Sequence, residues 1–167
     1  MVIENCLVLI KPDGLMKGVT GDIISHLSFA NLKIIGMKVT KVSKEVAEAH
    51  YAEHKEKSFY KELIDFITGK YHTDRVVAIV YRGEDAVKKI RTLAGSTHPE
   101  KAEAGTIHAK YGRINSETKN IENVIHASDS PQSAEREIKI WFSPNEITEE
   151  IYPTVSETEK VKVKNWA

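Results

Sequence analysis

Two unbroken apolar runs, Cys6–Ile10 and Val76–Tyr81, most constrain what this chain can fold into. Short continuous apolar runs that end at turn-forming or charged residues are typical of strands buried inside a sheet. The first run ends at Lys11–Gly14, whose proline, aspartate and glycine favour a turn. Because helical patterns lie between the runs, helices are expected to pack against the sheet. The pattern alone leaves parallel and antiparallel pairing open.

The other segments alternate between strand and helix patterns. Lys33–Val42 is rich in β-branched residues and predicts a further strand. Ser43 is expected to cap a helix that runs toward His54. Periodicity fades over Ser96–Glu122, which predicts a long loop region, and loops of that length are often functional. Three further helical faces are expected, formed by Ile23, Ile24, Leu27 and Ala30, by Phe59, Leu63, Phe66 and Ile67, and by Ala86, Val87, Ile90 and Leu93.

Composition is that of a soluble globular protein with one main domain. The chain has 167 residues, and its 24 Lys and Arg balance its 24 Asp and Glu, so the formal net charge is zero. This balance argues against nucleic acid as a partner. The single cysteine, Cys6, excludes an internal disulfide and fits a reducing compartment. With no signal pattern and no apolar run of membrane-spanning length, we expect a cytoplasmic location and no membrane contact.

The segment 123–131 combines a histidine with the start of a helix. Ser130 followed by Pro131 predicts an N-cap and a first helical position. His126 therefore precedes a helix start, where unpaired N–H groups and the helix dipole attract anions. The apolar stripe of this helix consists of Ala134, Ile138, Trp141 and Phe142.

Glu137 lies on the same side of the predicted helix as that apolar stripe. A lone carboxylate is costly to bury there, and pairing with the imidazole of His126 would relieve the cost. The pairing would also fix which ring nitrogen is free to react. A histidine oriented by a carboxylate beside an anion site is a candidate covalent nucleophile.

His50 and His54 have helical i, i+4 spacing, which resembles a pair of metal ligands. No third ligand is evident in the sequence. We therefore interpret the two histidines as part of a solvated helix face.

The segment Asn123–Asp129 resembles the active-site signature of nucleoside diphosphate kinases. The resemblance extends over roughly residues 3–142, with counterparts in the family's order at 9–14, 49–54, 76–80, 105–107 and 133–138. It implies an α+β, ferredoxin-like fold with a four-stranded antiparallel sheet and helices on one face. It also implies a ping-pong transfer of the γ-phosphate of a nucleoside triphosphate, such as ATP or GTP, to a nucleoside diphosphate.

The resemblance also assigns roles to individual residues. His126 becomes the nucleophile that carries the phosphate as phosphohistidine, and Glu137 orients it. Asp129 would meet a Mg²⁺ ion. The implied nucleotide-binding residues are Lys11, Arg91, Thr97 and Asn123 for phosphates or ribose, Tyr51 beside the histidine, and Phe59 and Leu63 for the base. Because stacking on an aromatic face tolerates any base, a broad substrate range follows.

Departures from the family concern mainly the phosphate site. His108 stands where the family has a phosphate-binding arginine, and histidine is shorter and only partly charged near neutral pH. Lys110 or Arg113 could supply the missing charge. Short insertions lie near 70–75 and 112–122, and Glu122 replaces another frequent arginine. The alternative function is therefore a nucleotide-binding regulatory member with weak or lost transferase activity.

The resemblance divides the chain into a kinase-like domain, 1–142, and a C-terminal extension, 143–167. The extension is polar, and the alternation near Val161 and Val163 predicts either a short edge strand or a flexible tail. Members of the family are homohexamers or tetramers. Since the extension could cover a neighbouring subunit, a homo-oligomer is expected, with the hexamer favoured over the tetramer.

Overall fold

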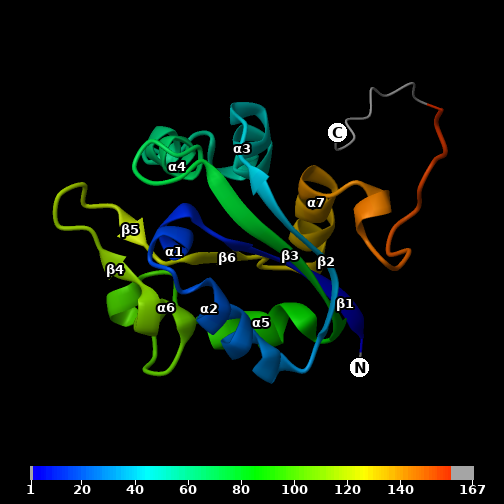
Figure 1. Ribbon diagram of the computed structural model, residues 1–167, viewed down its shortest axis with the longest axis horizontal. Helices are drawn as coiled ribbons and strands as arrows, with labels where there is room; N and C mark the ends of the chain where they lie inside the picture. The colour runs from blue at the N-terminus through cyan, green and yellow to red at the C-terminus, as the bar shows by residue number, and fades with distance from the viewer. Residues whose placement is uncertain (1, 159–167) are drawn as a thin grey trace, which may run out of the picture.

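The computed structural model describes residues 2–158, which build a four-stranded sheet with helices around it (Figure 1). The strand order is β2-β3-β1-β6, and every neighbouring pair is antiparallel. The predicted α+β class with an antiparallel sheet is thus confirmed, and the two apolar runs form its central strands. The strands are β1 Ile3–Ile10, β2 Lys33–Lys41, β3 Arg75–Glu84 and β6 Ile125–Ala127.

Helices cover both faces of the sheet, so the expectation that they lie on one face was wrong (Figure 1). In β1, Val8 packs toward α2, α5 and α6, whereas Leu9 packs toward α3, α4 and α7. Successive side chains of a strand point to opposite faces, so an all-apolar run needs cover on both. The α-helices are α1 Pro12–Met16, α2 Thr20–Leu27, α3 Lys44–His50, α4 Tyr60–Ile67, α5 Ala86–Ala94, α6 Ile107–Tyr111 and α7 Pro131–Trp141, and the 3₁₀ turns are η1 Ser28–Ala30, η2 Ala52–His54, η3 Pro99–Lys101 and η4 Pro144–Glu146.

Two predicted helix caps are confirmed. The Ser43 hydroxyl accepts a hydrogen bond from the N–H of Val46 at 3.3 Å, at the start of α3. The Ser130 hydroxyl accepts from the N–H of Ser133 at 3.1 Å, and Pro131 is the first residue of α7. These bonds satisfy N–H groups that have no partner within the helix. The start of α7 is therefore fixed close to the end of β6.

The predicted loop between residues 96 and 122 contains short regular elements. Besides η3 and α6, it includes β4 Arg113–Ile114 and β5 Ile121–Glu122, which pair as a hairpin. The sequence predicted only a long loop region here, because elements of two to five residues are too short to show a period.

The first part of the C-terminal extension packs on the chain's own sheet. The Thr148 N–H donates to the carbonyl of Ile35 in β2 at 2.8 Å, and Lys38 pairs with Glu146 at 2.7 Å. Packing of the extension on a neighbouring subunit stays a prediction. The alternation at Val161 and Val163 lies outside the described residues.

The sequence raised two questions, the reactivity of its single cysteine and the presence of a membrane-spanning helix. Cys6 is fully buried in β1, and burial, together with the nearby Glu137 carboxylate, raises the pKa of its thiol to about 12. The thiol is therefore a packing group rather than a nucleophile. Over residues 2–158, every helix is too short or too polar to cross a bilayer.

The fold predicts different stabilities for one substitution at two sites. Ile79 is completely buried in β3, so Ile79→Val leaves a gap and is expected to lower the free energy of unfolding by about 0.5–1.5 kcal/mol. Ile3 is 54% exposed at the start of β1, and Ile3→Val should change it by less than about 0.5 kcal/mol. Urea denaturation of both variants measures the difference. Equal losses would contradict the assignment of β3 to the core.

Candidate active site

The backbone at Val124 positions the whole site. Val124 has a φ of 61°, in the left-handed region that β-branched residues rarely adopt. Its N–H donates to the buried Asp13 carboxylate at 2.9 Å, and its carbonyl accepts from the N–H of Lys11 at 2.8 Å. A Cβ on Gly14 would lie 3.0 Å from the Val124 carbonyl oxygen, so the glycine permits this close approach. Lys11–Gly14, predicted as a turn but found at the start of α1, therefore holds the segment between Asn123 and His126.

His126 and Glu137 form the pair that the sequence predicts. His126 lies on β6, and its Nε2 donates to Oε2 of Glu137, on α7, at 3.1 Å. Ser128 donates to the same oxygen at 2.6 Å and accepts from the N–H of Leu7 at 3.1 Å. Since a carboxylate only accepts, the neutral ring keeps its proton on Nε2 and its lone pair on Nδ1. The buried carboxylate is thus paired, and one ring nitrogen stays free to react.

His50 belongs to this site, so its interpretation as part of a solvated helix face was wrong. Its side chain is buried, and its ring contacts the His126 ring edge to face, with centroids 4.5 Å apart. The Nε1–H of Trp141 donates to its Nδ1 at 3.1 Å. Burial lowers the pKa of His50 well below its ordinary value, helped by the nearby His126 and Arg136. A neutral ring therefore packs beside the candidate nucleophile, while His54 is exposed.

His50, His126 and Glu137 each place one ligand atom within 4.8 Å of the others, as metal ligands do. The hydrogen bonds argue against a metal site. Trp141 occupies the lone pair of His50 Nδ1, so the proton of that neutral ring lies on Nε2. His50 consequently offers no free lone pair to a metal ion. Instead, His50 packs against the His126 ring and Glu137 accepts its hydrogen bond.

Lys11, Asn123 and Thr97 meet beside this cluster. The Lys11 ammonium donates to the side-chain oxygen of Asn123, whose amide donates to the carbonyl of Thr97 at 2.8 Å. Burial lowers the pKa of Lys11, and Asp13 opposes the shift. The ammonium also lies 5.2 Å from the centre of the Phe66 ring. The fold thus brings together Lys11, Asn123 and Thr97, which the resemblance assigned to nucleotide binding.

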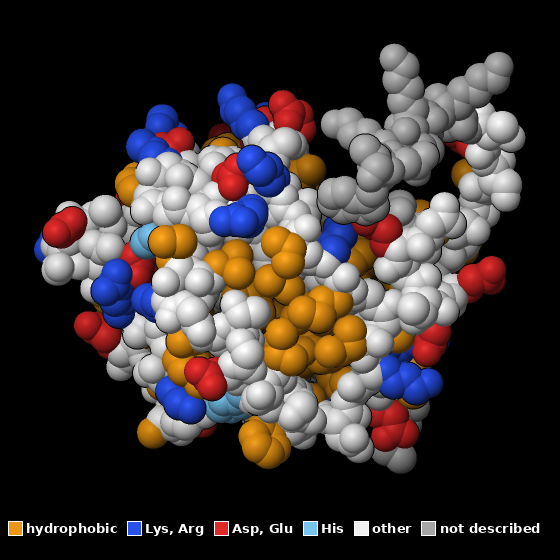
Figure 2. Space-filling model, in the orientation of Figure 1, with side chains coloured by type: hydrophobic (Ala, Val, Ile, Leu, Met, Phe, Trp, Pro, Cys, Tyr) orange, Lys and Arg blue, Asp and Glu red, His pale blue; other side chains and the backbone are white. Residues whose placement is uncertain are grey.

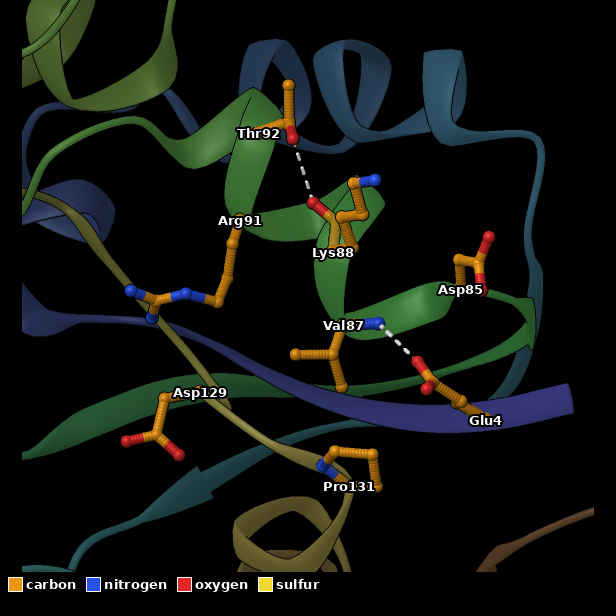
Figure 3. A pocket seen from close by; sticks show the side chains of 8 residues that line it. All are labelled: Glu4, Asp85, Val87, Lys88, Arg91, Thr92, Asp129 and Pro131. Carbon is orange, nitrogen blue, oxygen red and sulfur yellow. Dashed lines mark hydrogen bonds between the residues drawn. The ribbon is translucent and has the colours of Figure 1, made fainter. Parts of the chain in front are cut away.

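Arg91 and Asp129 line a cavity of about 580 Å³ between α5 and the start of α7 (Figure 3). In Figure 3 the Arg91 side chain extends from α5 toward the Asp129 carboxylate, away from Asp85. Hydrogen bonds from Ser133 and Ser130 lower the pKa of Asp129, so its carboxylate is ionised near neutral pH. The cavity therefore presents charges of both signs to a ligand, since Lys88, Glu4 and Asp85 line it as well.

Tyr51, Phe59 and Leu63 come from α3, α4 and the connection between them. Tyr51 is buried against the His50 ring at 4.6 Å, and burial raises the pKa of its phenol, which stays protonated. Phe59, just before α4, is 49% exposed, and Leu63 is half-buried one turn later. A large aromatic side chain left this exposed is available to stack on a planar ligand.

The sequence model of the family described as nucleoside diphosphate kinase matches residues 4–147. This chain belongs to the nucleoside diphosphate kinase family. It is 46% identical to a nucleoside diphosphate kinase of Archaeoglobus fulgidus over 86% of this chain and 89% of that protein. It is 47% identical to that of Pyrococcus horikoshii, over 92% and 93% of the two chains. The family assignment makes the chain a nucleotide-binding kinase, as the resemblance implies.

Solved structures of the nucleoside diphosphate kinase family share the fold. The Halobacterium salinarum enzyme in complex with CDP is 36% identical, with a TM-score of 0.80 over 90% of this chain and 95% of that one. The Borrelia burgdorferi enzyme, a transition-state mimic with vanadate and ADP, is 31% identical, with a TM-score of 0.79 over 91% and 94%.

His108 stands where the resemblance implies a phosphate-binding arginine, and its side chain bonds to the chain's own backbone. Its Nδ1 donates to the carbonyls of Ser96 at 2.9 Å and Gly95 at 3.1 Å. Burial lowers the pKa of His108 more than these bonds raise it, so the ring is neutral at pH 7. It cannot replace the charge of the family's arginine there. Arg113 pairs with Glu122 at 2.6 Å, and Lys110 is exposed.

The titration of His108 tests this assignment. Its ¹⁵N signals are expected to titrate with a midpoint below 6.5, because burial disfavours the charged ring. A two-dimensional NMR pH titration measures the midpoint, and the His108→Gln variant identifies the signal. A midpoint above 7 would show a charged ring that binds anions and would contradict the hydrogen bonding described here.

Proposed function

We propose that the chain transfers the γ-phosphate of a nucleoside triphosphate to a nucleoside diphosphate through His126. Nδ1 of His126 attacks the γ-phosphorus, a P–N bond forms, and the bond to the β,γ-bridging oxygen breaks. The nucleoside diphosphate leaves with that bond pair. A terminal oxygen of a second nucleoside diphosphate then attacks the phosphorus, and the P–N bond breaks. The observation that carries the proposal is the hydrogen bond from Nε2 to the buried Glu137, which leaves Nδ1 free.

Glu137 contributes orientation and charge. When Nδ1 bonds to phosphorus, the ring becomes positively charged and Nε2 keeps its proton. The carboxylate that accepts this proton's hydrogen bond then faces a cation instead of a neutral donor, and such charge-assisted bonds are stronger. Ser128 holds the same carboxylate oxygen against rotation. The pair therefore stabilises the charged intermediate more than the resting ring.

The remaining residues would bind the nucleotide. Lys11 and Arg91 supply cations for the phosphates, which suits phosphoryl transfer because it depends mainly on positioning and charge stabilisation. Asn123 and Thr97 hold Lys11 in place and lie where ribose or phosphate oxygens would bind. Tyr51 remains neutral beside the histidine. Exposed Phe59, with Leu63, would clamp the base by stacking, which supports a broad range of nucleotides.

Asp129 fits a role in binding Mg²⁺. Mg²⁺ in nucleotide enzymes is held by one or two carboxylates and by the substrate's phosphates. The Asp129 carboxylate is exposed, ionised and close to Arg91 in the cavity, which satisfies that requirement. A bound Mg²⁺ ion would supply positive charge that neutralises the negative charge developing on the phosphates. Asp129 itself would only hold the ion near the phosphates.

The sole cysteine, buried in β1, supports the proposed cytoplasmic location.

The second candidate function is a regulatory, nucleotide-binding member with weak or lost transfer. The observation that favours it is the neutral His108, which removes one positive charge from the phosphate site. His126, Glu137 and Lys11 are nonetheless arranged for transfer. We therefore place transferase activity first.

The test of transfer is phosphorylation of the protein itself. With ATP and Mg²⁺, intact-mass spectrometry should show one added phosphate that is labile in acid and is lost on addition of GDP. His126→Ala should abolish the mark, whereas His26→Ala, at a half-buried histidine on α2, should keep it. Glu137→Gln should slow phosphorylation by about 10- to 100-fold, as expected for a group that orients a histidine.

The outcomes separate the two functions. ADP binding without any mass shift at saturating ATP would support the regulatory function and contradict the transferase activity. A mark that survives in His126→Ala would place the nucleophile elsewhere.

We also propose a homo-oligomer, with a hexamer favoured over a tetramer. Ile34, Met37 and Val39 of the edge strand β2 are exposed, and Figure 2 shows hydrophobic side chains gathered on this face. Exposed apolar side chains on an edge strand favour association. The C-terminal extension packs beside this strand, where it could also contact a neighbouring subunit.

Light scattering coupled to gel filtration tests the assembly. The mass should be six times that of one chain, and Met37→Lys should reduce it because a charge is costly to bury in an interface. Met16→Lys, at another exposed methionine, on α1, is the control and should leave the mass unchanged. A fourfold mass would contradict the hexamer, and a single-chain mass would contradict assembly.

A further inference from the structure

Glu122 is a buried carboxylate bound by side chains from three separate parts of the chain. Only 1% of its side chain is exposed. Its oxygens accept from Arg113 at 2.6 Å, Asn115 at 2.8 Å, His72 at 3.1 Å and Lys17 at 3.3 Å. Lys17 follows α1, His72 lies between α4 and β3, and the other two belong to the β4–β5 hairpin. The two insertions that set this chain apart therefore meet at one carboxylate.

The energetics make this junction specific. Burial alone would raise the pKa of Glu122, but the hydrogen bonds from Arg113 and Asn115 and the charge of Lys17 lower it to about 2. A buried carboxylate is tolerated only when its oxygens are paired. Arg113 and Asn115 hold the hairpin's own shape. His72 and Lys17 instead join the hairpin to other segments.

Both ends of the His72–Glu122 contact reach residues assigned to nucleotide binding. Glu122 directly precedes Asn123, whose side chain accepts from the Lys11 ammonium. The His72 ring packs edge to face on Phe66 at 5.5 Å, and the Lys11 ammonium lies over the same ring. Phe66 is on α4, the helix that also carries Leu63 and follows Phe59. One contact thus connects the base-binding helix to the phosphate-binding residues.

We propose that Glu122 and His72 are positioning residues that hold α4 at a fixed distance from Lys11 and Asn123, so that a nucleoside diphosphate meets a preformed cleft. The inference rests on the proposed function, because it assumes that these residues bind the nucleotide. Neither residue touches the reacting atoms. A preformed site binds more tightly because less ordering is needed on binding. The two insertions act together in this role, one supplying each partner.

His72→Leu removes the link while leaving three donors on Glu122. Calorimetry with ADP should show roughly 3- to 10-fold weaker binding, and the KM for GDP should rise by a similar factor. The rate of His126 phosphorylation at saturating ATP should stay within about twofold, because the histidine and Glu137 are untouched. His72→Gln, whose amide can donate to Glu122, should restore binding. The matched control is His26→Leu, since His26 is also half-buried beside a phenylalanine, Phe29, at 6.1 Å.

The ADP affinity of Glu122→Gln provides a second measurement, at the other end of the contact. Glu149→Gln is its control. Glu149 also pairs with an arginine, Arg82, at 3.0 Å, but it lies outside the cleft. Unchanged ADP affinity in His72→Leu would overturn the positioning role. So would a fall in the saturating phosphorylation rate with an unchanged KM. If the wild-type chain itself neither binds ADP nor becomes phosphorylated, the proposed function fails instead.

Discussion

The left-handed backbone at Val124 is the constraint on which the site depends. A β-branched residue in this conformation costs about 1–3 kcal/mol and persists only when its surroundings impose it. Here the Asp13 carboxylate, the Lys11 N–H and the close approach of Gly14 impose it together. The resulting bend lets Asn123 reach Lys11 while His126 continues into β6. The strained backbone at Val124 thus fixes the position of the phosphate-binding Lys11 relative to the nucleophile His126.

A second feature is that the buried charged groups around the site are paired with other side chains. Glu137 has Ser128 and His126, Glu122 has four donors, and Lys11 has Asn123. His50 is neutral instead, because burial disfavours its charged form, and its Nδ1 accepts a hydrogen bond from Trp141. Arg91 and Asp129 are exposed charges that line the cavity between α5 and α7. Charge near the nucleophile is therefore supplied at defined points.

Local sequence signals predicted the parts of the site that depend on neighbouring residues. Ser130 and Pro131 fixed the start of α7, and helical spacing brought Glu137 to the side of His126. The environment of His50 could not be found in this way, because its partner, Trp141, is distant in sequence. The contacts of Glu122 could not be predicted either, because His72 and Lys17 are distant in sequence. The strands of its hairpin are also too short to show a period. The continuous apolar runs called for cover on both faces of the sheet, and the expectation of helices on one face did not take this into account.

His108 shows how a buried side chain can hold the backbone together instead of presenting a charge. By donating to the carbonyls of Gly95 and Ser96, it ties the start of α6 to the end of α5. An arginine placed there would add a positive charge, but the two carbonyl groups would lose the ring N–H that now donates to them. A protein engineer who wished to rebuild the arginine clamp would therefore have to replace that donor as well. The histidine and the loop around it form one exchangeable unit.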